Sequence, residues 1–123
     1  MKLITFAVPC YNSENYMCQC IDSLLTGGED VEIIIVNDGS SDGTAGIADK
    51  YAEQYPSMVR AVHKENGGHG SGVNKGLEAA SGLYYKVVDS DDWLDGDALR
   101  GLLETIRKHL REKRLPDLYL TNF

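Results

Sequence analysis

The chain has little cysteine, and the three cysteines that it has do not follow a disulfide pattern. Cys10, Cys18 and Cys20 are an odd number with no framework spacing. If Cys18 and Cys20 lie on a helix, two positions apart, their side chains point to different faces, so they cannot bind zinc together. We therefore expect reduced cysteines that are packed in the fold.

Long hydrophobic runs and an excess of positive charge are also missing. No segment approaches 18 consecutive apolar residues, and the short apolar run after Lys2 is soon interrupted by Pro9. We therefore expect neither a signal peptide nor a membrane span, and a cytoplasmic location. The 12 Lys and Arg against 19 Asp and Glu leave a net charge of −7. This balance argues against nucleic acid as a partner and favours small molecules or proteins.

The chain also lacks repeats, low-complexity tracts and any linker. Its 123 residues, 42% hydrophobic and 25% charged, fit a single domain over residues 1–123. Periodicity alternates between strand and helix along this length. We expect strands at residues 3–8, 31–36, 58–63, 83–89 and 118–120, and helices at residues 14–25, around 48–55, 74–80 and 97–114. This alternation predicts an α/β fold with a mostly parallel sheet covered on both faces.

Polar segments follow the ends of the first four expected strands. They are residues 9–14, 37–43, 64–72 and 89–92, and the third of them contains a glycine-dense stretch that we place between elements. Ligands of parallel α/β sheets bind beyond the carboxyl ends of the strands. We therefore expect the four segments to meet at one rim of the sheet.

The most informative of these segments is acidic. Asp89, Asp91 and Asp92 follow an apolar run, where three carboxylates repel one another unless water or a cation lies between them. Oxygen ligands at the end of a strand suit Mg²⁺ or Mn²⁺. The alternative is a cap cluster for the helix that begins near residues 95–97, although a cap needs only one acid.

Other polar residues have both a structural and a functional interpretation. Asp38 can belong to a turn that leads into a helix N-cap, or it can accept hydrogen bonds from a base or ribose. His69 can be a solvated loop residue or can touch a diphosphate. The glycine-rich stretch matches neither the dinucleotide fingerprint nor the P-loop, but its backbone amides can still approach a phosphate or sugar.

Taken in order, these motifs resemble the inverting family 2 glycosyltransferases, which have the GT-A fold. The resemblance covers essentially the whole chain. It is carried by Val8-Pro9-Cys10-Tyr11-Asn12, by the run from Val36 to Thr44, by Glu65-Asn66-Gly67-Gly68 with Asn74-Lys75-Gly76, and by Asp89-Ser90-Asp91-Asp92-Trp93. It implies a Rossmann-like, three-layer nucleotide-diphospho-sugar transferase domain, truncated after about five strands and forming the N-terminal part of a longer enzyme.

The resemblance also implies roles for individual residues. Asp89 and Asp91 match the DxD motif, the first near the ribose and the second on a Mn²⁺ or Mg²⁺ ion, with Asp92 in support. The other implied donor-binding residues are Pro9, Tyr11 and Glu14 in the base pocket, Asp38 on the base or ribose, and Asn66, Gly67 and Lys75. The donor is a nucleotide-diphosphate sugar, expected to be a UDP-sugar. The acceptor is a saccharide, a lipid-linked molecule or a protein, as in the synthesis of cell walls or polysaccharides.

Two departures from the family pattern affect what this chain is expected to do. Many relatives have Ala-Arg-Asn where Gly72-Val73-Asn74 stands here, so a guanidinium is missing that His69 or Lys75 would have to replace. The family's catalytic base, an Asp or Glu, lies beyond the point where this sequence stops at Phe123. We therefore expect donor and metal binding with little or no transfer, and any membrane association in regions outside this chain.

Other classes of α/β protein stay open at this stage. A phosphotransferase of the haloacid dehalogenase type also uses Asp-x-Asp, but after its first strand. A receiver-type signalling domain needs acids where Pro9-Cys10-Tyr11 stands. A non-catalytic nucleotide-binding module remains a further alternative, which hydrolysis of a UDP-sugar would argue against.

Overall fold

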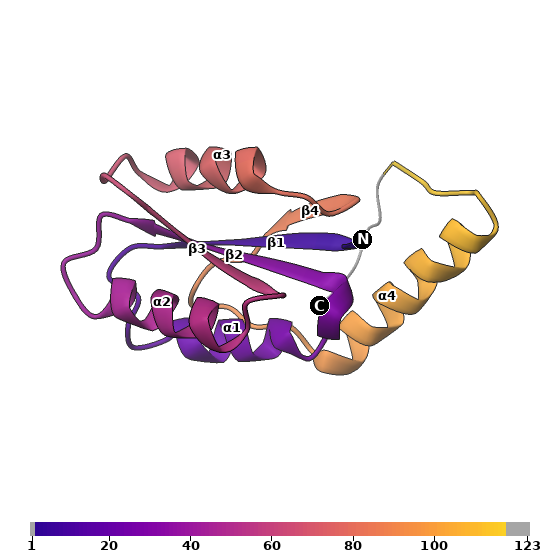
Figure 1. Cartoon of the computed structure of the whole chain (residues 1–123), viewed down its shortest axis with the longest axis horizontal. Helices are drawn as coiled ribbons and strands as arrows, with labels where there is room; N and C mark the ends of the chain where they lie inside the picture. The colour runs from indigo at the N-terminus through magenta and orange to yellow at the C-terminus, as the bar shows by residue number, and fades with distance from the viewer. Residues whose placement is uncertain (1, 118–123) are drawn as a thin grey trace.

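The computed structural model describes residues 2–117, and the strand expected at 118–120 lies outside them. Within this range four parallel strands form one sheet in the order β3-β2-β1-β4 (Figure 1). The elements in chain order are β1 (Ile4–Cys10), α1 (Met17–Leu25), the 3₁₀ turn η1 (Gly28–Asp30), β2 (Val31–Asp38), α2 (Thr44–Gln54), β3 (Val59–Lys64), α3 (His69–Ala79), β4 (Tyr84–Val87) and α4 (Gly96–Arg111).

The helices cover both faces of the sheet, as expected. Figure 1 shows α3 on one face and α1 and α2 on the other, with α4 beyond the end of α1. From β1 to β3 the chain moves across the sheet in one direction, and from β3 it returns past β2 and β1 to β4. Because such crossovers are right-handed, the reversal moves α3 to the opposite face. The topological switch point therefore lies between β1 and β4, where α/β proteins bind ligands.

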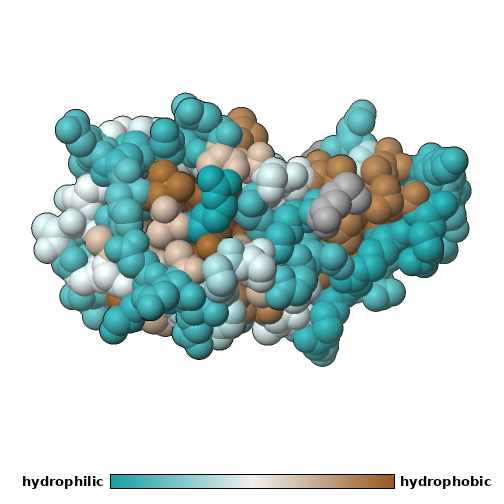
Figure 2. All heavy atoms as spheres, viewed as in Figure 1, coloured by the Kyte–Doolittle hydropathy of each residue, from teal (hydrophilic) through white to brown (hydrophobic). Residues whose placement is uncertain are grey.

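The centre of the core is formed by β1 and β2, in which every residue is buried. The edge strands β3 and β4 are only partly buried. Strands covered on both faces need a continuous apolar run, and Ile33 to Val36 supplies one. Helix α4 adds the stripe Leu99, Leu102, Leu103 and Ile106, while polar side chains cover its outer side (Figure 2).

The strand register brings the polar segments to one rim. Cys10 lies opposite Asn37, and Asp38 lies opposite Lys64. The first two strands end two residues later than expected, so Pro9 belongs to β1 rather than ending it. A proline is tolerated there because β4 pairs only with residues 4–7 of β1.

The last two strands are also shifted from the expected positions. β3 covers Val59–Lys64, one residue later than predicted, and β4 covers only Tyr84–Val87. Asp89 is therefore outside β4 and belongs to the loop that follows it. This position gives the acidic segment access to solvent, which three neighbouring carboxylates require.

Helices α1, α2 and α3 begin elsewhere than predicted, α2 at Thr44 rather than around residue 48, and α4 ends at Arg111 rather than residue 114. α1 starts at Met17 rather than residue 14, so Tyr16, expected inside the helix, is its N-cap and is 49% exposed. α3 starts at His69, five residues early, so part of the glycine-rich stretch is helical and not a loop. This part of the helix packs closely on the sheet, since a Cβ on Gly72 would lie 3.3 Å from the Pro9 Cβ.

The cysteines are free; Cys10 and Cys20 are buried as expected, whereas Cys18 is exposed and not packed in the fold. Burial raises the pKa of Cys10 and of Cys20 to about 12, so neither forms a thiolate readily. Cys18 lies on the exposed side of α1, which confirms that it and Cys20 face different directions. Between residues 2 and 117, no helix has the length and hydrophobicity needed to cross a membrane.

Candidate functional site

Two adjoining cavities lie at the carboxyl ends of the strands. The first, of about 280 Å³, is lined by Pro9, Cys10, Tyr11, Asp38, Asn66, Gly68 and His69. The second, of about 480 Å³, is lined by Pro9, Tyr11, Ser13, Tyr16, His69, Asp89, Ser90 and Asp91. Because Pro9, Tyr11 and His69 line both, the two cavities form one continuous site.

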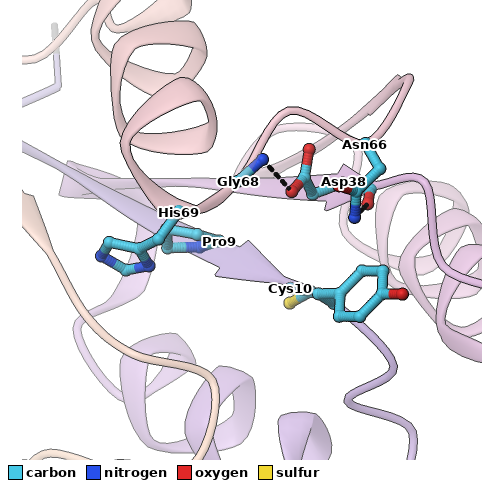
Figure 3. A pocket seen from close by; sticks show the side chains of 7 residues that line it. Pro9, Cys10, Asp38, Asn66, Gly68 and His69 are labelled. Carbon is cyan, nitrogen blue, oxygen red and sulfur yellow. Dashed lines mark hydrogen bonds between the residues drawn. The ribbon is translucent and has the colours of Figure 1, made fainter.

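Asp38 organises the wall of the first cavity. Its Oδ1 accepts hydrogen bonds from Lys64 Nζ at 2.6 Å and from the Gly67 N–H at 2.9 Å, and its Oδ2 accepts one from the Gly68 N–H at 2.9 Å (Figure 3). Lys64 and these two N–H groups hold the pKa of the buried Asp38 carboxyl below its ordinary value. A carboxylate oxygen accepts about two hydrogen bonds, so Oδ2 keeps one lone pair for a ligand.

Asn66 and Gly67 belong to the same wall. The Asn66 side chain lines the cavity and donates from Nδ2 to the Asp38 carbonyl at 3.1 Å. Gly67 contributes its N–H to Asp38 rather than lining the cavity itself. Gly39 has φ +67°, and a Cβ there would lie 2.6 Å from the Asn66 backbone nitrogen. The site therefore requires a glycine at the end of β2.

The loop after β1 is tied to the loop after β2. Glu14 does not line either cavity: its Oε2 accepts a hydrogen bond from the Gly43 N–H at 2.9 Å, while its own N–H donates to Asp42 Oδ2 at 3.3 Å. Asp42 Oδ1 also accepts from the Thr44 N–H at 3.0 Å. Asp42 therefore forms the turn that was expected before α2, whereas Asp38 faces the cavity.

The acidic segment lies at the far side of the second cavity. One ligand oxygen from each of Asp89, Asp91 and Asp92 falls within 4.8 Å of the others, and all three residues are exposed. Asp95, and not this cluster, caps α4, since its side chain accepts from the Asp97 N–H at 3.0 Å. The three aspartates therefore remain available for a ligand.

The cluster fits a small divalent cation. Magnesium holds its oxygens at about 2.1 Å, so opposite ligands are roughly 4.2 Å apart. Small side-chain rotations would bring oxygens that now lie within 4.8 Å to such positions. Asp89 and Asp91 face the second cavity, while Asp92 does not line it.

No lysine or arginine is among the described residues that line the two cavities. Lys64 is adjacent, but its ammonium is paired with Asp38. Lys75 lines neither cavity, and its Nζ lies 3.9 Å from Glu78 Oε2. His69 contributes an imidazole to the lining, and its Nε2 lies 3.8 Å from Asp89 Oδ1.

Several residues of the site were not anticipated from the sequence. Ser13, Ser90, Tyr16 and Gly68 line the cavities, and Lys64 holds Asp38. Ser90 stands inside the acidic motif and Lys64 ends a strand, so both positions gave a signal. The contact between Ser13 and Ser90 spans 77 residues and leaves no local pattern.

Fold and site together define a parallel α/β domain in which a ligand cavity adjoins an acidic cluster suited to a metal ion. The model of Glycosyl transferase family 2 matches residues 5–112, so the chain belongs to this family. That membership confirms the resemblance found in the sequence and sets aside the receiver and haloacid dehalogenase alternatives.

Similar proteins agree with this assignment. The chain is 42% identical over 103 residues to the putative glycosyltransferase EpsH of Bacillus subtilis (strain 168), covering 83% of this chain and 30% of EpsH. S. aureus TarS 1-349 in complex with UDP-GlcNAc superposes with a TM-score of 0.75 at 32% identity, over 89% of this chain and 32% of that one. The mannosyltransferase PcManGT from Pyrobaculum calidifontis in complex with GDP-Man and Mn²⁺ has a TM-score of 0.72 at 25% identity, over 82% of this chain and 31% of that one.

These neighbours confirm the expected GT-A fold, with four strands within the described residues. The chain spans about a third of the length of EpsH, TarS 1-349 and PcManGT. The comparisons therefore concern only the matching third of each of these relatives.

Proposed function

We propose that this chain is the donor-binding part of a glycosyltransferase that moves a sugar from a nucleotide-diphosphate sugar to an acceptor hydroxyl, with inversion and with a divalent cation. The observation that carries the proposal is the charge of the two joined cavities. Asp38, Asp89 and Asp91 line them, with no lysine or arginine among the described lining residues. A diphosphate is strongly anionic, so it would bind there only with a cation between it and the carboxylates.

The shape of the site suggests how a donor would lie. The Asp38 and Asn66 end would take the nucleoside, since it offers a free acceptor position on Asp38 Oδ2 beside the exposed ring of Tyr11. The acidic end would take the diphosphate and the sugar. Asp91 would hold Mn²⁺ or Mg²⁺ with Asp89, and Asp92 would support them. The UDP-GlcNAc bound to TarS and the GDP-Man and Mn²⁺ bound to PcManGT support this donor class, and TarS favours UDP.

In the proposed reaction the cation, when bound, offsets the charge that develops on the leaving nucleoside diphosphate. A carboxylate would deprotonate the acceptor hydroxyl. We propose that this base lies in sequence beyond Phe123, because Asp38, Asp89 and Asp91, which line the cavities, are all assigned to the donor or to the metal. Residues 1–123 would then form one N-terminal domain of a longer enzyme that makes cell-wall or other polysaccharide. We propose that this enzyme works in the cytoplasm.

The first test is calorimetric titration of UDP into this chain with and without Mn²⁺. Asp91→Ala should abolish the metal-dependent part of the binding because it removes a ligand oxygen. Glu53→Ala, an exposed carboxylate on α2, is the control and should bind as the wild type does. Absence of UDP binding at any Mn²⁺ concentration, or binding that Asp91→Ala leaves intact, would contradict the proposal.

The lack of transfer is tested separately. The isolated chain should bind UDP-sugar without passing the sugar to any acceptor, and rapid transfer by these 123 residues would place the base within them. Slow metal-dependent hydrolysis of the donor would argue for a transferase site and against a module that only binds nucleotide.

A further inference from the structure

We propose that His69 binds the diphosphate of the donor and is a positioning residue for it, an inference that rests on the proposed function. His69 lines both cavities, and it stands where one passes into the other. In Figure 3 its ring lies beside Pro9 on the side away from Asn66, while Asp38 and Asn66 occupy the opposite end. A donor with its nucleoside at Asp38 and its sugar beyond Asp89 would pass its phosphates by this imidazole.

Besides the hydroxyls of Tyr11, Ser13, Tyr16 and Ser90, the described lining offers the imidazole of His69 as a basic donor for phosphate. Phosphate oxygens need N–H or O–H donors, and the charged side chains of the lining are otherwise aspartates. The imidazole Nε2 lies 3.8 Å from Asp89 Oδ1, so the ring is next to the carboxylate cluster without being one of its ligand residues. A phosphate held by a cation on Asp89 and Asp91 would therefore lie within reach of the ring.

The backbone fixes where this imidazole lies. The Gly68 N–H is bound to Asp38 Oδ2 at 2.9 Å, and α3 begins at the next residue. Gly68 has φ +91°, a conformation that favours glycine. The wall of the nucleoside end and the position of the His69 ring are therefore set by one short segment.

Lys75 is the other basic candidate on α3, and its position is less suitable. Its Nζ pairs loosely with Glu78 at 3.9 Å, and the residue lines neither cavity. His69 is therefore better placed than Lys75 to reach a phosphate in the two cavities.

The test separates phosphate binding from nucleoside binding. UDP and pyrophosphate are titrated with Mn²⁺ by calorimetry, and uridine is followed by NMR, for the wild type, His69→Ala and His69→Gln. His69→Ala should weaken the affinity for UDP and for pyrophosphate by roughly tenfold to a hundredfold, which is the range for a hydrogen bond to a charged group. The affinity for uridine should change less than twofold. His69→Gln keeps an N–H donor and should recover part of the lost affinity for UDP and pyrophosphate. Glu78→Ala, an exposed position on the same helix, serves as the control.

The outcomes distinguish this inference from the proposed function. If the wild type binds UDP with Mn²⁺ and His69→Ala binds it equally well, the role of His69 is overturned but the proposed function is not. An equal loss for uridine and UDP also overturns it, because His69 would then act on the wall of the nucleoside end. Wild type that binds no UDP overturns the proposed function and this inference with it.

Discussion

The hydroxyl oxygens of Ser13 and Ser90 lie 2.8 Å apart and join the loop after β1 to the acidic loop after β4. Ser13 is buried, and its N–H also donates to Thr44 Oγ1 at 2.9 Å. The acidic loop is therefore attached through Ser13 to the start of α2. Ser90 stands between Asp89 and Asp91, so this hydrogen bond restricts the positions of both carboxylates.

We expect Ser13 and Ser90 to show coupled effects on metal-dependent binding. Removing either hydroxyl should weaken binding of UDP with Mn²⁺, because the carboxylates must then be ordered when the ligand binds. In a double-mutant cycle of Ser13→Ala and Ser90→Ala, the coupling free energy should be about 0.5–1.5 kcal/mol. The measurement is UDP affinity by calorimetry for the four proteins. Strictly additive effects would show that the two loops act independently.

The rim of the site could be predicted because its signal is local. Polar residues follow β-branched or apolar runs, and the carboxyl ends of parallel strands meet at one edge. The details depend on contacts between distant residues. The hydrogen bond from the Gly43 N–H to Glu14 joins two distant segments, and neither segment has a sequence pattern that indicates it. Glu14 was therefore expected in the base pocket, although it does not line either cavity.

The early start of α3 was missed for a different reason. Glycine disfavours helix interiors, so a stretch rich in glycine predicts a loop. In the fold, Gly72 and Gly76 lie one turn apart and face Pro9 and Ala7 of β1. Their i, i+4 spacing is the signal that could have revealed a helix packed closely on a strand.

This packing predicts opposite effects for two helical glycine substitutions. Gly76→Ala should destabilise the protein, since the new Cβ would lie 2.7 Å from Ala7 Cβ and 2.9 Å from Tyr85 Oη. We expect a loss of about 1–3 kcal/mol in the free energy of unfolding, as in other overpacked cores. Gly46→Ala in α2 meets nothing within 4 Å and should stabilise by about 0.5–1 kcal/mol. Urea unfolding of both variants checks the pair, and a stabilising Gly76→Ala would show that α3 can move off the sheet.

Glu32 should make stability depend on pH at acid values. Burial by itself raises the pKa of the Glu32 carboxyl, but the Ser81 N–H, the Ser81 and Thr5 hydroxyls and Arg60 outweigh this and lower it below 4.5. The unfolded state then binds the proton more readily, so stability is full above about pH 4.5 and is lost as the pH falls towards the folded-state value.

The test for Glu32 is a series of thermal melts from pH 7 to pH 3. The wild type should lose stability below pH 4.5 more steeply than Glu32→Gln, which cannot titrate at this position. Glu104→Gln, an exposed carboxylate on α4, is the control and should keep the wild-type slope. Because Glu32 lies at the opposite end of the sheet from the cavities, the difference should appear without any ligand.

Asp38 should matter for stability as well as for the ligand. In Asp38→Asn the ion pair with Lys64 is lost, and the amide group places N–H donors against the N–H groups of Gly67 or Gly68. Breaking such a largely buried arrangement should lower the free energy of unfolding by about 2–4 kcal/mol. Asp49→Asn is the matched control, because the Asp49 carboxylate is exposed and is bonded to the ring of His63, at 2.7 Å. Its cost should stay below about 1 kcal/mol. If Asp38→Asn were as stable as Asp49→Asn, the segment from Lys64 to Gly68 would be held by other contacts.

The folded fraction of Asp38→Asn should bind UDP more weakly than the wild type, since the Oδ2 lone pair of Asp38 is the acceptor that the nucleoside end offers.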